Sequence, residues 1–207
     1  MANIYATERG LWKSGLSLIC GVDEAGRGPL AGPVVAGAVI FPTGFTGLPV
    51  NDCKLLTAEK RQELFGLIFE KALDVSTGAA SHTEIDEFNI HHASFLAMRR
   101  AIEKLKIMPE IVLVDGKFEI PKLTFPQKAI VKGDRLSASV AAASIVAKVT
   151  RDRMMQELDE QYPGWNLAQN KGYPTPEHKV LVVEKGISEI HRRTFCDHIT
   201  APTLFTK

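Results

Sequence analysis

Residues 19–40, ICGVDEAGRGPLAGPVVAGAVI, constrain the fold of this chain more than any other stretch. Two short apolar runs, at 18–22 and 34–40, flank a glycine-rich bend, and both are predicted to be buried strands. Asp23 and Glu24 stand between the first run and the bend. Because an unpaired carboxylate is costly to bury, two of them at the end of a core strand favour a bound cation as their partner.

Two other interpretations of this stretch stay open. The carboxylate pair can simply end a strand before a turn. Glycines after a strand also begin nucleotide-binding loops, but the spacing of Gly26, Gly28 and Gly32 does not fit G-x-G-x-x-G. Pro29 would also remove a backbone donor from such a loop. A nucleotide cradle is therefore the least favoured of the three interpretations.

The rest of the chain alternates predicted strands and helices. Further strands are predicted at residues 75–80, 111–114 and 128–131. Helices are predicted from Thr57, from a capping box at 83–86, from about 135 to about 158, and from Glu177. This order predicts an α/β fold, a mixed sheet of five strands covered by helices.

Length and composition predict one domain over residues 1–207, long enough to bury a sizeable core. No apolar run approaches the length of a membrane span, and the N-terminal segment lacks the apolar core of a secretory signal. Cys20, Cys53 and Cys196 are scattered, so they predict neither a disulfide framework nor a metal cluster. We therefore expect a cytoplasmic protein without a membrane partner, acting as a monomer.

Asp115 and Asp134 occupy positions that resemble that of Asp23. Asp115 follows the apolar run 111–114, and Asp134 precedes the long predicted helix. Each also has a local explanation, since Asp-Gly is a common turn pair and aspartate is a good helix N-cap. Taken alone, each local explanation is the better one.

Taken together, the three aspartates predict a metal site. Strand ends and helix starts converge at one edge of an α/β sheet, so Asp23, Asp115 and Asp134 are expected to meet there. Acidic oxygens without His or Cys select Mg²⁺ or Mn²⁺. Such clusters commonly hold two ions about 3.5–4 Å apart for phosphodiester hydrolysis.

Two points about this acidic set depend on geometry. Asp152 is a rival to Asp134, but the two would lie about 27 Å apart along one helix, so the sheet edge favours Asp134. Strand alternation should also point Asp23 and Glu24 to opposite faces. Either the chain kinks at residues 25–26, or Glu24 contributes its backbone carbonyl.

The net charge of the chain is +1, but its basic residues are unevenly distributed. Residues 99–153 carry 12 Lys and Arg against 6 Asp and Glu. Such an excess is usually solvated surface, and it is also compatible with a face that binds phosphates.

Four motifs resemble those of the ribonuclease HII family. They are DEAGRGPLAGPV at 23–34, VLVDG at 112–116, VKGDRLSASVAAASIVAKVTRD at 131–152 and KGYPT at 171–175. The resemblance spans roughly residues 18–195. It implies a ribonuclease H-like mixed sheet with a C-terminal, mainly helical extension from about residue 161.

The resemblance also implies an activity and its residues. Members cut the RNA strand of RNA–DNA hybrids and incise DNA duplexes 5′ to an embedded ribonucleotide, with Mn²⁺ or Mg²⁺. They leave 3′-hydroxyl and 5′-phosphate ends. The family's metal-binding catalytic acids correspond to Asp23, Glu24, Asp115 and Asp134. Its substrate contacts correspond to Gly26, Arg27, Gly28 and Tyr173.

The chain departs from the family pattern in two places. Residues 52–56, DCKLL, stand where the family usually has DSKKL, which puts a phosphate contact in question but not the chemistry. Cys196 and Asp197 replace a usual small residue and proline.

Two alternative functions remain open. One is a ribonuclease H-like resolvase or integrase, which cuts DNA without ribose. The other is a hybrid-binding module that needs no metal.

Overall fold

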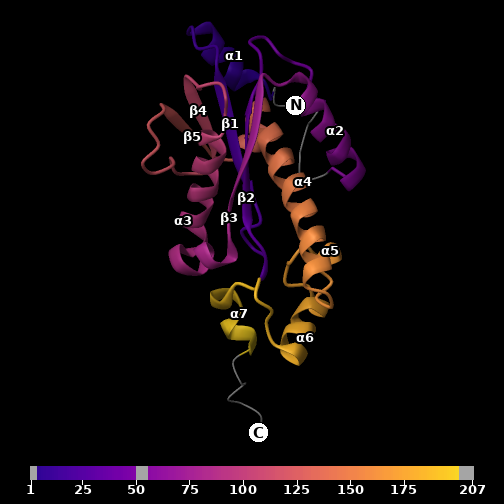
Figure 1. The fold of residues 1–207 in the computed structure, drawn as a ribbon. Coiled ribbons are helices and arrows are strands. Elements are labelled where there is room, and N and C mark those ends of the chain that lie inside the picture. Colours follow the sequence, from indigo (N-terminus) through magenta and orange to yellow (C-terminus); the bar gives the residue numbers. More distant parts are fainter. Residues whose placement is uncertain (1–3, 50–55, 201–207) are drawn as a thin grey trace.

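The computed structural model describes residues 4–49 and 56–200. Its centre is a five-stranded sheet in the order β3-β2-β1-β4-β5 (Figure 1). The strands are β1 (Ile19–Ala25), β2 (Val34–Ile40), β3 (Asp74–Ala80), β4 (Ile111–Asp115) and β5 (Gln127–Ile130). β1, β2 and β3 pair antiparallel, whereas β1, β4 and β5 pair parallel. The predicted mixed α/β sheet is confirmed.

Helices cover both faces of this sheet (Figure 1). They are α1 (Ala6–Lys13), α2 (Ala58–Lys71), α3 (His82–Glu103), α4 (Ala138–Gln161), α5 (Leu167–Asn170), α6 (Pro176–Lys185) and α7 (Arg193–Thr200), with a 3-10 turn, η2 (Gly133–Arg135). α3 covers one face, α4 and α2 cover the other, and α6 and α7 lie beyond one end of the sheet. None of these helices in the described ranges combines the length and the apolar character needed to cross a membrane.

Alternating side chains of each strand enter different cores. Cys20 and Val22 of β1 belong to the core on the α3 side, together with Val112 and Val114 of β4. Ile19 instead packs with Leu113 and Val140, on the side of α4. Because side chains alternate along a strand, the odd-numbered residues of β1 and β4 face α4. Asp23 of β1 and Asp115 of β4 therefore share that face.

Two glycines let α4 lie unusually close to the sheet. A Cβ on Gly21 would lie 2.1 Å from the backbone carbon of Ser139, and one on Gly37 would lie 2.5 Å from the Ala143 carbonyl oxygen. No real side chain fits at such distances. The close approach brings the middle of α4 beside the end of β1, where the acidic residues lie.

The structure corrects two predicted helix starts. The N-cap of α4 is Ser137, whose hydroxyl accepts the Val140 N–H, and Asp134 lies upstream in η2. The capping box of α3 begins at Ser81 and closes on Glu84, two residues before the predicted start. In both cases a serine directly before the first helical turn accepts a hydrogen bond from one of the free N–H groups of that turn. By contrast, Thr57 caps α2 as predicted.

Smaller differences complete the comparison with the sequence. β5 begins and ends one residue before the predicted 128–131. α1 and α5 had not been predicted at all. The family departures at positions 52–55, including Cys53, lie outside the described residues. The two free cysteines within them, Cys20 and Cys196, are both buried.

Candidate active site

Parallel pairing of β1 and β4 brings two of the predicted acids together. The register places Val22 opposite Val114, so the next residues, Asp23 and Asp115, lie on neighbouring strands and on the same face. The Oδ1 atom of Asp115 accepts the backbone N–H of Gly133 at 2.7 Å. The segments that carry Asp23, Asp115 and Asp134 are therefore neighbours along this part of the sheet.

Asp134 follows Gly133 in η2, so its position is tied to Asp115 through that hydrogen bond. Its side chain is 2% exposed. A buried aspartate in a short turn next to a second carboxylate has no capping function here, because Ser137 caps the helix. The correction to the helix start therefore removes the local explanation for this residue.

Asp23 and Glu24 point to different sides of β1. Asp23 is 6% exposed, and its Oδ1 accepts the Glu24 N–H at 2.7 Å. The Glu24 carboxylate accepts a hydrogen bond from Arg27 at 3.1 Å. β1 stays regular through Ala25, and the turn begins at Gly26, whose φ of 99° is in the left-handed region. The predicted kink at residues 25–26 thus follows both carboxylates and does not bring them to one face.

The electrostatics of this site favour a cation. Burial raises the pKa of Asp23 well above its ordinary value, and the charges of Glu24 and Asp115 raise it further, against a hydrogen bond from Ser144. Burial also raises the pKa of Glu24, although Arg27 opposes this. Asp23 is thus buried beside two other carboxylates, whereas Arg27 compensates the charge of Glu24 in part.

The chemistry of these donors fits Mg²⁺ or Mn²⁺, because all of them are carboxylate oxygens. As the side chains stand, no three His, Cys, Asp or Glu residues in the described ranges gather closely enough to hold an ion. Glu24 is engaged with Arg27 on the other side of its strand.

A cavity of about 400 Å³ opens beside Glu24. It is lined by Glu24, the Gly26–Arg27–Gly28 loop and Tyr173. The loop and Tyr173 are the substrate contacts that the family resemblance implies. The same cavity is lined by Arg61, Ser144 and Lys148, which the sequence analysis had not singled out.

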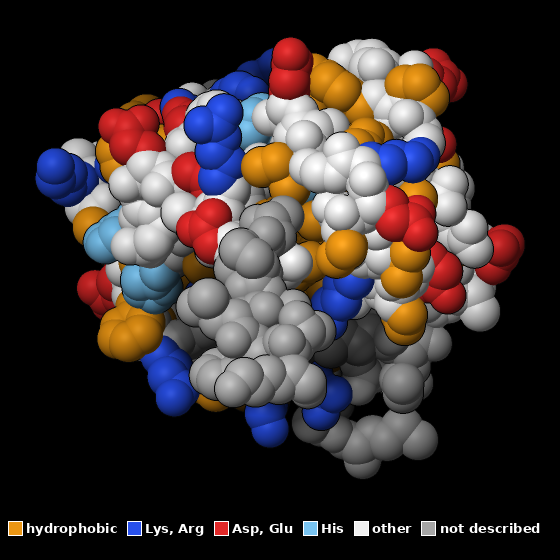
Figure 2. Space-filling model, turned by 90° about the horizontal axis from the view of Figure 1, so that it is seen from below, with side chains coloured by type: hydrophobic (Ala, Val, Ile, Leu, Met, Phe, Trp, Pro, Cys, Tyr) orange, Lys and Arg blue, Asp and Glu red, His pale blue; other side chains and the backbone are white. Residues whose placement is uncertain are grey.

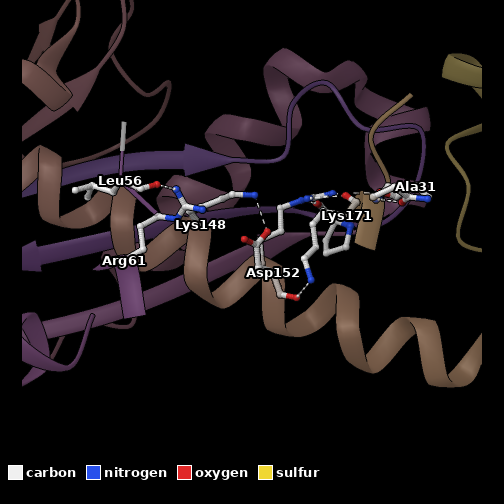
Figure 3. Close-up of polar contacts among 10 residues, drawn as sticks. Ala31, Leu56, Arg61, Lys148, Asp152 and Lys171 are labelled. Carbon is white, nitrogen blue, oxygen red and sulfur yellow. Dashed lines mark hydrogen bonds and ion pairs between the residues drawn. The ribbon is translucent and has the colours of Figure 1, made fainter. Parts of the chain in front are cut away.

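Ser144 and Lys148, which the sequence analysis had not singled out, stand at a helical spacing that the sequence shows. Ser144, Lys148 and Arg151 stand at i, i+4 and i+7 of the long helix, so they share one face of it. Lys148 forms an ion pair with Asp152 at 2.6 Å, and Lys171 reaches the Asp152 carbonyl at 3.5 Å (Figure 3). The carboxylate of the rival Asp152 is thus paired with Lys148.

Arg61 reaches the cavity from α2, where no helix pattern distinguished it from other surface arginines. It donates to the Leu56 carbonyl at 2.6 Å (Figure 3). Figure 2 shows the molecule from the end at which α6 and α7 lie. On that face Lys and Arg side chains alternate with Asp and Glu (Figure 2).

Tyr173 lies against the Gly-Arg-Gly loop. A Cβ on Gly28 would lie 3.9 Å from Cε1 of the Tyr173 ring. Lys148 and Arg151 lie over that ring, at 5.7 and 5.6 Å from its centroid. Such cation–π contacts hold an exposed ring in place. Tyr173 is 38% exposed, so it is accessible to a ligand from the cavity.

Two histidines, His178 and His191, connect the backbone carbonyl of Tyr173 to Ser188 through hydrogen bonds. The Ser188 N–H donates to Nδ1 of His191 at 3.0 Å, so the proton of neutral His191 is assigned to Nε2. That Nε2 lies 3.1 Å from Nε2 of His178, whose Nδ1 lies 2.9 Å from the Tyr173 carbonyl. With both rings neutral, each one donates once and accepts once, so the chain is fully satisfied.

Acid should weaken this histidine chain. Burial lowers the pKa of His178, and burial together with His178 lowers that of His191 to about 4. The unfolded chain therefore binds protons below about pH 6.5 that the folded chain excludes, so stability falls from there toward pH 4. The raised pKa values of Asp23 and Glu24 act in the opposite direction.

The test compares variants, because only a difference isolates the histidines. Thermal unfolding at pH 7 and pH 5 should show a smaller pH effect for His191→Asn than for wild type. The difference should be roughly 2–4 °C in Tm, the shift that about 1 kcal/mol produces in a chain of this size. His92→Asn, on the exposed surface of α3, serves as control and should keep the wild-type difference. An unchanged pH effect in His191→Asn would contradict the prediction.

Comparison with known proteins identifies close relatives. The family model described as ribonuclease HII matches residues 20–198. Ribonuclease HII of Myxococcus xanthus is 52% identical over 196 residues, which cover 94% of this chain and 67% of that protein. The crystal structure of ribonuclease H2 from Pyrococcus horikoshii matches with a TM-score of 0.76 and 30% identity, covering 88% of this chain and 97% of that one. Bst-RNase HIII in complex with Mn²⁺ shares the fold, with a TM-score of 0.64 and 18% identity over 82% of this chain and 63% of that one.

Proposed function

The chain belongs to the ribonuclease HII family, endoribonucleases that hydrolyse RNA in RNA–DNA hybrids, and from this membership we propose a more specific activity. The enzyme incises DNA duplexes on the 5′ side of an embedded ribonucleotide and leaves 3′-hydroxyl and 5′-phosphate ends. One observation carries the proposal: Asp23 and Asp115 lie on adjacent parallel strands, and Glu24, which follows Asp23, lines the cavity together with the Gly-Arg-Gly loop and Tyr173.

Asp23, Glu24, Asp115 and Asp134 are the residues that would hold two Mg²⁺ or Mn²⁺ ions. When bound, such ions lower the pKa of an attacking water and stabilise the leaving oxygen of the scissile phosphate. The carboxylates supply the oxygen ligands that these ions prefer. The hydrogen bond from Gly133 holds Asp115 in its orientation. A Mn²⁺ complex of the structurally similar ribonuclease HIII supports this choice of metal.

The Gly-Arg-Gly loop and Tyr173 recognise the ribonucleotide in this proposal. Glycine at 28 allows the backbone to approach a sugar closely, whereas a Cβ on Gly26 would clash with Arg151. The 2′-hydroxyl is both donor and acceptor, and it is the group that distinguishes RNA from DNA. Lys148 and Arg61 line the same cavity and provide positive charge for the neighbouring phosphates.

One incubation separates this function from its two alternatives. A DNA duplex with a single ribonucleotide is mixed with the protein and Mg²⁺, Mn²⁺ or a chelator. We expect cutting 5′ to the ribonucleotide with either metal and none with the chelator. Equal cutting of an all-DNA duplex would indicate a resolvase or integrase. Binding of RNA–DNA hybrid without any cutting would indicate a binding module.

Tyr173→Ala should weaken recognition of a single ribonucleotide more than cleavage of a long hybrid. A stacked aromatic contact is worth about 1–3 kcal/mol, so kcat/KM on the single-ribonucleotide duplex should fall roughly 5- to 150-fold. A long hybrid offers many registers and should lose less. Tyr173→Phe, which keeps the ring, is the matched control and should stay near wild type on both substrates. Equal losses of Tyr173→Ala on both substrates would reject the assigned role.

Arg27→Lys tests the other side of the same cavity. Arginine can make a forked contact to phosphate that lysine cannot reproduce. We therefore expect the same selective loss on the single-ribonucleotide duplex.

We further propose that the enzyme is cytoplasmic, is a monomer and folds as one domain over residues 1–207. Its two buried free thiols, Cys20 and Cys196, suit a reducing compartment.

A further inference from the structure

Two buried arginines lie beneath the loop at residues 26–33. Arg151 of α4 and Arg192, which immediately precedes α7, are both 0% exposed. Within the described residues neither guanidinium forms an ion pair with a carboxylate. A buried charge without an opposite partner is costly, so each position requires a compensating interaction.

Backbone carbonyls of the loop provide that compensation. Arg192 donates from Nε to Gly32 at 3.0 Å, from Nη1 to Arg27 at 3.1 Å and from Nη2 to Gly26 at 2.7 Å. Every guanidinium nitrogen of Arg192 is thus engaged with a different loop carbonyl.

Arg151 uses its guanidinium in the same way. It donates to the carbonyls of Pro33 at 2.9 Å, Ala31 at 3.3 Å and Lys171 at 3.0 Å. The last contact belongs to the loop that carries Tyr173. The two arginines therefore hold both predicted substrate loops from below.

The C-terminal segment also joins the loop through its backbone. The Arg192 N–H donates to the Leu30 carbonyl at 2.7 Å, and the Gly32 N–H donates to the Ile190 carbonyl at 2.9 Å. Leu30 in turn donates to the Gly172 carbonyl at 2.7 Å. Three chain segments are thereby connected, and Arg192 alone reaches the carbonyls nearest the cavity.

These contacts fix the direction of two N–H groups. In a trans peptide the C=O and the following N–H point in opposite directions, and none of the described peptide bonds is cis. Because the carbonyls of Gly26 and Arg27 point at Arg192, the N–H groups of Arg27 and Gly28 point away from it. Neither N–H donates to a protein acceptor within the described residues. Both residues line the cavity.

We propose that Arg192 is a positioning residue, which holds the N–H groups of Arg27 and Gly28 toward the cavity so that they donate to an oxygen of the ribonucleotide. The inference rests on the proposed function, since it names the residue that orients the recognition loop. Adjacent N–H groups pointing the same way form a site for an electron-rich oxygen. The two guanidiniums beneath them add positive charge. The C-terminal segment is therefore part of the recognition site.

Lysine at position 192 tests the geometry while keeping the charge. One ammonium group cannot reproduce a planar fork that reaches three separate carbonyls. Because a displacement of about 1 Å can cost about 10²-fold in rate, we expect Arg192→Lys to lose about 10- to 100-fold in kcat/KM on the single-ribonucleotide duplex. The loss on a long hybrid should be smaller, and affinity for an all-DNA duplex should stay near wild type. Arg193→Lys, at the exposed neighbouring arginine, is the matched control and should match wild type throughout.

Each outcome decides a different claim. If wild type does not cut the ribonucleotide duplex, the proposed function fails. If wild type cuts and Arg192→Lys cuts both substrates equally well or equally poorly, Arg192 is only structural and this inference fails. A parallel loss of affinity for all-DNA duplex would also overturn it, because the N–H pair would then serve an ordinary backbone phosphate.

A measurement on unaltered Arg192 covers the case in which Arg192→Lys does not fold. In an Asp115→Asn background, which should bind without cutting, the amide signals of Arg27 and Gly28 are followed by NMR. Adding the single-ribonucleotide duplex should shift both signals, whereas an all-DNA duplex should shift them much less. Identical responses to the two duplexes would overturn the inference.

Discussion

Replacing Asp115 with asparagine is expected to reduce cleavage of the ribonucleotide duplex by at least about 10²-fold, since loss of even an outer-shell partner of a metal site costs about 10–100-fold. Asparagine keeps the shape of the side chain, and its oxygen can still accept the Gly133 N–H that Asp115 accepts at 2.7 Å. It removes one negative charge beside Asp23. The fold should therefore survive, while the attraction for a divalent cation is lost.

The experiment measures cleavage with Mg²⁺, duplex affinity in chelator, and the rise in Tm on adding Mn²⁺. Wild type should gain stability from the metal by mass action, and Asp115→Asn should gain much less. Its Tm without metal should equal or slightly exceed that of wild type, because repulsion of Asp23 is relieved. Duplex affinity in chelator should stay within a few-fold of wild type.

Asp152→Asn is the matched control, since Asp152 was the rival carboxylate on α4. Its carboxylate pairs with Lys148, and a partly exposed pair of this kind contributes only about 0–1 kcal/mol. Its cleavage rate should stay within a few-fold of wild type. Full Mg²⁺-dependent turnover by Asp115→Asn would count decisively against the proposed chemistry.

The sheet and two of its acids could be predicted because their causes are local. Residues 18–22 and 111–114 are apolar runs too short for helices, and each ends in a carboxylate. Parallel strands bring their carboxyl ends to one edge, so Asp23 and Asp115 follow from strand assignment alone. That β1 and β4 are direct neighbours is a long-range pairing, which the structure adds.

The remaining parts of the site depend on contacts that a sequence pattern does not encode. Asp134 and Ser137 are both acceptable N-caps, and only the packing of η2 against β4 decides between them. Arg192 looks like any arginine before a helix, yet the loop carbonyls 160 or more positions away give it its role. Family resemblance supplied Tyr173, whose tyrosine-proline sequence alone predicts only a turn.

Replacing Gly21 with alanine is expected to destabilise the protein severely. The added Cβ would lie 2.1 Å from the Ser139 backbone carbon and 2.3 Å from the Val140 nitrogen. Both atoms belong to the backbone of α4, so no side-chain rotation can relieve the clash, and the whole helix must move. Overpacking of this kind costs about 1–3 kcal/mol and occasionally more, which corresponds to a fall in Tm of roughly 2–12 °C.

Gly66→Ala is the matched control, because it makes the same chemical change where nothing lies within 4 Å. Gly66 lies inside α2, so alanine there should stabilise the protein by about 0.5–1 kcal/mol. The two substitutions should therefore move Tm in opposite directions. If Gly21→Ala unfolds at the wild-type temperature, the close contact of α4 with β1 is wrong. The same contact places Ser144 beside Asp23 and Lys148 at the cavity. Under conditions where the variant stays folded, Gly21→Ala should therefore also lose cleavage activity. Gly66→Ala should keep its activity.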